Sequence, residues 1–189
     1  MPAKMIHKKL SSSQIILFGF LMVILVGAGL LMLPAAAASG EGTPFLDCLF
    51  TSTAAVCVTG LIVHDTATHW SFFGQAVILL LIQFGGMGVI TVAVAIAMAS
   101  GKRITLMQRS TMQEAISAHH VGGIVKLTGF ILRTTLLIEL LGAALLSTVF
   151  CREYGLWRGL WMALFHSVSA FCNAGFDLMG TQEPYVSLM

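Results

Sequence analysis

The chain has 189 residues, of which 57% are hydrophobic and only 10% are charged, and its formal net charge at pH 7 is +2. Soluble domains carry about 25% charged residues, so this composition excludes an ordinary soluble globular domain and places the chain in a lipid bilayer. Its long apolar runs have the length of membrane-spanning helices, and we therefore predict an all-α membrane protein.

The first apolar run follows a short basic tail, residues 1–13, and predicts a membrane-spanning helix over residues 14–34. A spanning helix needs about 20 apolar residues. This run is too long for a cleavable signal peptide, whose apolar part has roughly 7–15 residues. Pro34 stands where such a helix should stop.

A second helix is predicted over residues 44–57, because Pro44 suits a first helical turn. This helix is too short to cross a membrane, so we expect it to enter the bilayer and stop partway. Residues 58–61 form the turn that follows it and contain Gly60. Non-helical backbone is tolerated at membrane depth only where it is buried in protein or lines a watery cavity. The turn is therefore a candidate pore lining.

The second spanning helix is predicted over residues 71–99 and completes a first pore unit, residues 14–99. Three glycines lie close together in this span, at Gly85, Gly86 and Gly88. Small residues let another segment approach closely inside a membrane, so we expect these glycines to form a groove for another helix or for the turn.

The connection over residues 100–123 is polar and carries positive charge, as does the N-terminal tail. Because cytoplasmic loops are enriched in Lys and Arg, we expect the N-terminus and this connection in the cytoplasm and residues 62–69 outside. The aromatic belt at the outer interface is then expected to include Trp70, Trp157 and Trp161.

Residues 124–189 are predicted to form an incomplete second pore unit. It has a span over 125–150, a short helix over 157–172 and a turn over 173–177. Glu139 lies deep within the span, where an ionisable residue is a functional candidate by default. We expect its side chain to face the protein interior and to bond to a neighbour.

The two predicted units are related by an internal sequence repeat. Leu49–Gly60, LFTSTAAVCVTG, returns 115 residues later as Leu164–Gly175, LFHSVSAFCNAG, with six of twelve positions identical. The same offset places Leu25–Leu31 over Leu140–Leu146, with five of seven identical. Such a repeat defines the architecture. A long helix, a short helix and a glycine turn, used twice in a membrane, is the layout of an ion-selective pore.

The turn has the chemistry that a dehydrated cation needs. Backbone carbonyls supply several oxygens at once without a fixed negative charge. Glycine permits the backbone torsions that let successive carbonyls point the same way. A short helix that ends at the turn also directs the negative end of its dipole toward the ion.

Four motifs also carry a family resemblance: Val56–Leu61, Gln83–Gly88, Gly101–Ile104 and Ser169–Asp177. Together they resemble the Trk/Ktr/HKT superfamily of potassium transporters, most closely its KtrB and TrkH membrane subunits. The resemblance implies four such units around one pseudo-fourfold pore. This chain holds one complete unit and most of a second, so we expect an N-terminal fragment, truncated after the second filter.

The resemblance further implies potassium uptake across the plasma membrane by a pore-forming subunit. The full-length protein would form a homodimer and bind a cytoplasmic nucleotide-binding regulatory subunit of the KtrA or TrkA kind. Gly60 and Gly175 would be the filter glycines, with Leu61 and Phe176 in the same filter segments. Potassium would be bound by the backbone carbonyls of Val58, Thr59, Gly60, Asn173, Ala174 and Gly175.

Other functions remain open at this stage. One is a sodium-permeable monovalent-cation transporter of the same fold, and another is a non-conducting membrane assembly subunit. An enzyme would need convergent catalytic groups, whereas the candidates lie on different segments, so we predict no enzyme, no organic cofactor and no nucleic-acid partner. Those scattered candidates are Cys57, Cys172, His166 and Glu139.

Overall fold

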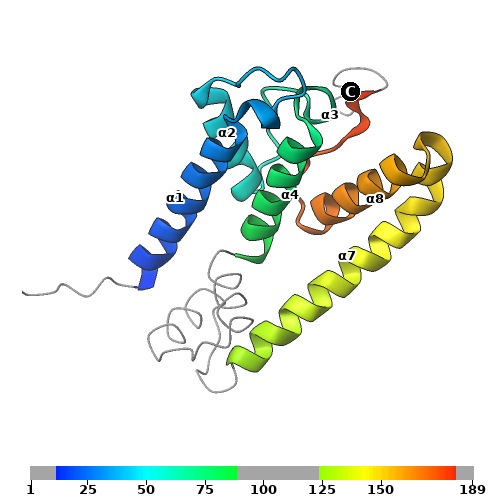
Figure 1. Cartoon of the computed structure of the whole chain (residues 1–189). Helices are drawn as coiled ribbons and strands as arrows, with labels where there is room; N and C mark the ends of the chain where they lie inside the picture. The colour runs from blue at the N-terminus through cyan, green and yellow to red at the C-terminus, as the bar shows by residue number, and fades with distance from the viewer. Residues whose placement is uncertain (1–11, 89–123, 182–189) are drawn as a thin grey trace, which may run out of the picture.

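The computed structural model describes residues 12–88 and 124–181. Figure 1 shows its helices in chain order: α1 (Ser12–Leu31), η1 (Pro34–Ala36), α2 (Phe45–Val56), α3 (Thr66–His69), α4 (Phe72–Met87), α7 (Ile124–Tyr154), α8 (Leu156–Phe171) and η2 (Met179–Thr181). Most of the predicted basic tail, the end of the predicted second span and the predicted connection over 100–123 lie outside the described residues.

The described residues are helical, as the sequence predicts, and contain no strand beyond one isolated bridge between Ala37 and Trp70. Among residues 12–88 and 124–181, two helices are long and apolar enough to cross a membrane, over Ser13–Leu31 and Lys126–Tyr154. α4 has 16 residues and ends at Met87, where Gly88 follows with a φ of +81°, so this helix ends within the predicted span over 71–99. The division of the chain into two pore units stays a prediction.

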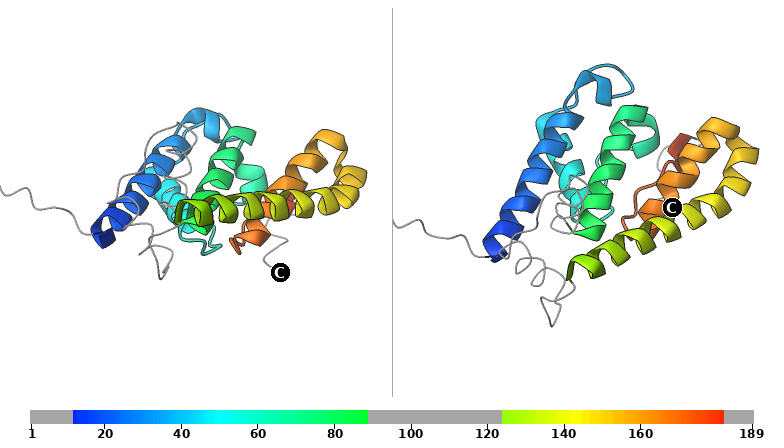
Figure 2. Two further views of the ribbon diagram at one scale, coloured as in Figure 1. Left: turned by 90° about the horizontal axis from the view of Figure 1, so that it is seen from below. Right: turned by 60° about the horizontal axis from the view of Figure 1, so that its bottom comes forward.

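In the N-terminal half, α2 and α4 both pack against α1. Figure 2 shows α1 and α4 running side by side, with the shorter α2 beside them. The start of α4 is capped by Ser71, whose hydroxyl oxygen accepts a hydrogen bond from the Gly74 N–H at 3.2 Å. Such a cap satisfies one of the free N–H groups of the first turn.

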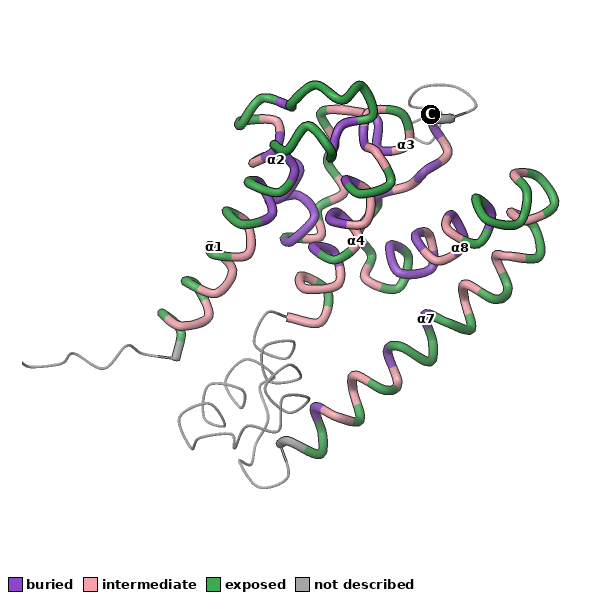
Figure 3. The backbone as a smooth tube through the Cα atoms, in the orientation of Figure 1, coloured by how far each residue is buried: buried purple, intermediate pink, exposed green. Residues whose placement is uncertain are grey.

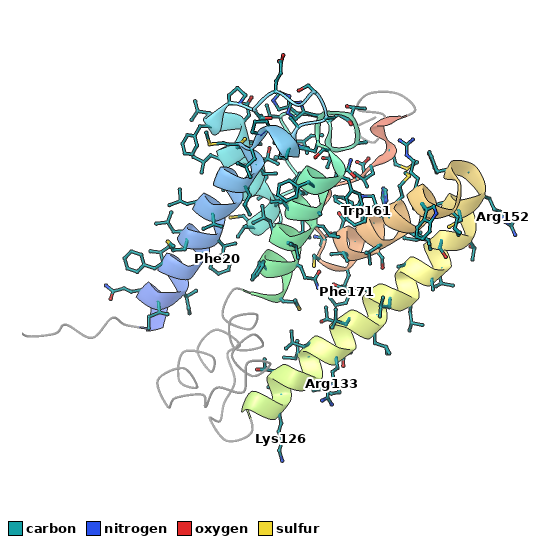
Figure 4. The ribbon with its side chains drawn as sticks, in the orientation of Figure 1. Phe20, Lys126, Arg133, Arg152, Trp161 and Phe171 are labelled. Atoms are coloured by element: carbon teal, nitrogen blue, oxygen red, sulfur yellow. The ribbon has the colours of Figure 1, made fainter. Side chains whose placement is uncertain are left out.

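In the C-terminal half, α7 and α8 form a helical hairpin. α7 continues to Tyr154, beyond the predicted end at residue 150, and the chain reverses at Gly155, which has a φ of +79°. A positive φ is favourable for glycine, which explains why the helix ends there and not at residue 150. Figure 4 shows Lys126 and Arg133 in the first part of α7 and Arg152 near its other end.

Buried residues gather where α2, α3, α4 and α8 meet, whereas α1 and α7 keep much of their surface exposed (Figure 3). Large apolar side chains such as Met22 and Leu145 are 60% and 74% exposed. Exposed apolar helix faces of this extent suit a lipid environment. Trp70 is an exception to the sequence prediction, because it is only 1% exposed and belongs to the protein core.

Candidate functional site

The turn after α2, residues 58–61 and here the first turn, closes the helix with two backbone hydrogen bonds. The Val58 N–H donates to the Ala55 carbonyl at 3.3 Å, and the Thr59 N–H donates to the Ala54 carbonyl at 3.0 Å. Val58 has a φ of +56°. This pattern is a Schellman motif, which ends a helix through one left-handed residue. A β-branched residue is a strong outlier in that conformation, so the surrounding structure must hold the turn in place.

The turn after α8, residues 173–177 and here the second turn, repeats this geometry. The Asn173 N–H donates to the Ala170 carbonyl at 3.1 Å, and the Ala174 N–H donates to the Ser169 carbonyl at 2.7 Å. Asn173 also has a φ of +56°. Each donor, acceptor and left-handed residue stands 115 residues after its counterpart in the first turn. The internal repeat therefore extends from sequence to backbone conformation.

The two turns meet at Gly60 and Gly175, each of which has a φ of +73°. A Cβ atom added to Gly60 would lie 2.9 Å from the Ala174 carbonyl oxygen and 3.2 Å from the Gly175 Cα. A Cβ atom added to Gly175 would lie 3.1 Å from the Gly60 Cα. The turns thus approach backbone to backbone, and glycine is required at both positions for its torsions and for space.

The other predicted site residues differ between the turns. Thr59 and Asn173 are exposed, and Ala174 is fully buried. Leu61 is 59% exposed, whereas its counterpart Phe176 is 2% exposed. The Phe176 carbonyl accepts a hydrogen bond from the Ser169 hydroxyl at 2.5 Å. The structure therefore brings Gly60, Ala174 and Gly175 together and does not place Leu61 and Phe176 equivalently.

Two serines that the sequence analysis did not single out dock the short helices on the long ones. The Ser52 hydroxyl of α2 donates to the Ile24 carbonyl of α1 at 2.8 Å. The Ser167 hydroxyl of α8 donates to the Glu139 carbonyl of α7 at 2.6 Å. Both donors and both acceptors are separated by the repeat offset. The repeat offset alone would have identified Ser52 and Ser167 as counterparts. It would not have identified their acceptors, which lie on the neighbouring long helices.

A glycine on each long helix makes room for each serine. A Cβ atom on Gly27 of α1 would lie 2.5 Å from the Ser52 Oγ, and a Cβ atom on Gly142 of α7 would overlap the Ser167 Oγ. These glycines are again repeat counterparts. Small residues allow close helix contact inside a membrane, so the repeated glycine and serine set how closely each short helix approaches its long helix.

The glycines of α4 contact the ends of both short helices. A Cβ atom on Gly85 would overlap the Val56 carbonyl oxygen, and a Cβ atom on Gly86 would lie 2.8 Å from the Cys172 Cβ. Val56 ends α2 two residues before the first turn, and Cys172 stands directly before the second turn. The glycine groove expected from the sequence is thus occupied by the ends of α2 and α8.

A polar cluster ties the segment after the first turn to the start of α2. The His64 Nε2 lies 2.9 Å from the Asp47 Oδ2, and the His64 and His69 rings stack with centroids 4.0 Å apart. The His69 Nε2 lies 3.0 Å from the Thr43 Oγ1. Burial lowers the pKa of His69, nearby His64 lowers it further, and Asp47 opposes the shift. These contacts fix the path of the chain that leaves the first turn.

Side chains offer little for a metal ion in the described ranges 12–88 and 124–181. No group of three or more His, Cys, Asp or Glu residues there is placed to hold a metal. Cys48, Cys57, Cys151 and Cys172 are free thiols. The two turns provide backbone carbonyl oxygens, which are ligands of the kind found in potassium filters.

Comparison with known proteins gives consistent matches along most of the chain. Residues 10–182 match the TrkH family, described as cation transport protein. The chain is 44% identical over 177 residues to the potassium/sodium uptake protein NtpJ of Enterococcus hirae, covering 94% of this chain and 39% of that protein.

Two further relatives belong to Ktr systems. The chain is 44% identical over 165 residues to the Ktr system potassium uptake protein B of Bacillus subtilis, covering 87% of this chain and 37% of that protein. The same-named protein of Vibrio alginolyticus is 39% identical over 165 residues, with 87% and 36% coverage. The chain thus spans about two fifths of the length of these relatives.

Proposed function

Because this chain belongs to the TrkH family of cation transport proteins, we propose that it contributes two units of a potassium uptake pore in the plasma membrane. Its relatives are named as uptake proteins and not as enzymes. Membrane location follows from the family together with the two apolar helices that are long enough to cross a bilayer.

The observation that carries the proposal is the repeated turn. Two segments 115 residues apart end their helices through the same hydrogen bonds and the same left-handed torsion, and they meet at Gly60 and Gly175. Helices that merely pack have no need for a strained valine in such a turn. This disfavours the non-conducting assembly subunit.

In this proposal α2 and α8 are pore helices, and the two turns are filter segments. The carbonyls that would bind the ion belong to Val58, Thr59, Gly60, Asn173, Ala174 and Gly175. Carbonyl oxygens replace the hydration shell of a cation without adding fixed charge. The negative ends of the α2 and α8 dipoles would add a favourable field.

Potassium is the first candidate ion, and sodium is the second. The Bacillus subtilis relative is named for potassium alone, whereas the Enterococcus hirae relative is named for potassium and sodium, and both are 44% identical to this chain. Backbone carbonyl oxygens can bind either ion, so a sodium-permeable transporter remains the alternative to a potassium transporter. Homodimerisation of the full-length protein, a cytoplasmic nucleotide-binding regulatory subunit and a cytoplasmic N-terminus also belong to this proposal.

The test uses Gly60→Ser and Gly175→Ser in the complete gene product, expressed in cells that lack their own potassium uptake. Each added side chain meets backbone of the opposite turn, so we expect loss of uptake or a lower preference for potassium over sodium. Gly129→Ser on α7 is the matched control, because a Cβ atom there meets nothing within 4 Å. Unchanged potassium affinity and sodium discrimination in both filter variants, at normal membrane amounts, would refute the proposal.

A further inference from the structure

We infer that Gln83 of α4 is a positioning residue that holds the second turn in register with the first. This inference rests on the proposed function, since it assigns a device that aligns the two filter segments. The Gln83 Nε2 donates to both carboxylate oxygens of Glu139 on α7, at 2.8 and 3.0 Å. A side chain of the first unit thereby hydrogen-bonds to α7, the long helix of the second unit.

The partner of this contact is a deeply buried carboxylate. Glu139 is 3% exposed, in agreement with the interior placement expected from the sequence. Removing a carboxylate from water is costly unless hydrogen bonds compensate. Loss of the Gln83 amide would leave the buried carboxylate without that donor. Because this loss is costly, the hydrogen bonds keep α4 and α7 at the distance at which Gln83 reaches Glu139.

Glu139 also carries the short helix of the second unit. Its backbone carbonyl accepts the hydrogen bond from Ser167 on α8. The position of α8, and of the turn at its end, is therefore set through the same residue that Gln83 holds. A displacement of Glu139 would be passed directly to α8.

The carbonyl oxygen of the Gln83 amide lies beside the residue that precedes the second turn. The Gln83 Oε1 accepts a weak hydrogen bond from the Cys172 Sγ at 3.9 Å. Cys172 directly precedes Asn173, the left-handed residue of that turn. Gly86 lies one helical turn after Gln83 and also contacts Cys172, whereas neighbouring Gly85 contacts the end of α2. This short stretch of α4 therefore contacts the C-terminal ends of α2 and α8, just before the two filter segments.

The repeat argues for a specific role and against simple packing. The counterpart of Glu139 in the first unit is Ile24, an apolar residue. The shared framework of the units thus works without a carboxylate at this place. The hydrogen-bonded pair of Gln83 and Glu139 is an addition where the first unit contacts the second, which is where the two turns must be aligned.

The experiment exchanges the two partners in the complete gene product. Gln83→Glu places two carboxylates against each other, and we expect the preference for potassium over sodium to fall about tenfold, since an unpaired buried charge costs more than one ordinary hydrogen bond. Glu139→Gln keeps an amide donor and an acceptor and should stay within about threefold of the parent. The double variant Gln83→Glu/Glu139→Gln restores the pair in reverse and should recover most of the loss.

The measured quantity is the ratio of the potassium uptake rate to the sodium uptake rate. The amount of each variant in the membrane is measured in the same cells. Gln75→Leu is the matched control, because Gln75 also lies on α4 but bonds to Trp161 at 2.8 Å and not to a turn. It should lower stability without changing the ratio. Gln83→Met, which removes the amide without adding charge, serves if Gln83→Glu does not accumulate.

An unchanged ratio in Gln83→Glu and Gln83→Met, or a double variant as impaired as Gln83→Glu, would overturn the inference. Gly60→Ser and Gly175→Ser are measured in the same series. If these variants alter the ratio and the Gln83 variants do not, the positioning role fails alone. If the glycine variants also leave the ratio unchanged, the proposed function fails with it.

Discussion

The contact between Gly142 and Ser167 allows a prediction that can be worked out in numbers. Gly142→Ala adds a methyl group that overlaps the Ser167 Oγ. The serine must move, and its 2.6 Å hydrogen bond to the Glu139 carbonyl is then broken. We expect this single methyl group to loosen α8 from α7.

The magnitude follows from three contributions. A net hydrogen bond contributes about 1 kcal/mol, and an unsatisfied buried hydroxyl raises that cost to about 1–3 kcal/mol. Overpacking costs about 1–3 kcal/mol, whereas alanine in place of glycine within a helix returns up to about 1 kcal/mol. Gly142→Ala should therefore destabilise the fold by about 1–5 kcal/mol, and Ser167→Ala by about 1 kcal/mol.

The double variant Gly142→Ala/Ser167→Ala tests whether the loss in Gly142→Ala comes from the clash with the Ser167 Oγ. Without the Oγ, the nearest atom to the new methyl is the Cβ of residue 167 at 3.5 Å, an ordinary contact. The double variant should be no less stable than Ser167→Ala, which corresponds to a favourable coupling as large as the Gly142→Ala loss itself, about 1–5 kcal/mol.

The assay is unfolding of the purified complete gene product in detergent, followed by the loss of helical signal. Gly129→Ala is the matched control on the same helix, since a Cβ atom there meets nothing within 4 Å. It should be neutral or stabilising. Additive effects in the double variant, or an equal loss in Gly129→Ala, would refute the reasoning.

Two further predictions concern the segment between the first turn and α4. The pKa of His69 lies below its ordinary value, chiefly through burial and then through His64, against the opposing effect of Asp47. The unfolded chain therefore binds the proton first, so stability is retained above the ordinary histidine pKa of about 6.5 and falls as the pH drops below it. Thermal midpoints between about pH 7.5 and 5 should fall less steeply in His69→Gln, and equal slopes in the two proteins would contradict this. Asp65 accepts hydrogen bonds from the Ala67 and Thr68 N–H groups at 2.9 and 3.0 Å. Asp65→Ala should cost about 1 kcal/mol of unfolding free energy and Asp65→Asn clearly less, measured by the same unfolding assay, and an equal loss in both variants would argue against a capping role.

The sequence was sufficient to locate the two short helices and the turns that follow them, because these depend on local signals. Apolar run length, a proline at a helix start and a glycine after a short helix act over a few residues. The predicted short helices at 44–57 and 157–172 correspond to Phe45–Val56 and Leu156–Phe171 in the structure. The later end of α7 depended on Gly155, a further local signal.

The partners across helices could not be predicted, because they depend on how the helices pack. Nothing near Gln83 in sequence indicates Glu139, which lies 56 positions away. The burial of Trp70 in the protein core could not be predicted for the same reason. Tryptophan suits both a membrane interface and a core, and only the packing of α3, η1 and α4 decides that this one is buried.

Some residues that the two copies of the repeat share are ones that backbone geometry requires, whereas Glu139, which differs between the copies, lies where the two copies contact each other. Ser52 and Ser167 dock the short helices, and Gly60 and Gly175 permit the meeting of the turns. At the Glu139 position, by contrast, the first unit has an isoleucine. A repeated unit can keep its turn only if its internal contacts are conserved, whereas its outer contacts must follow its place around a shared axis. The differences between the copies are therefore the better guide to how the turns are aligned, and Glu139 with Gln83 is the clearest of these differences.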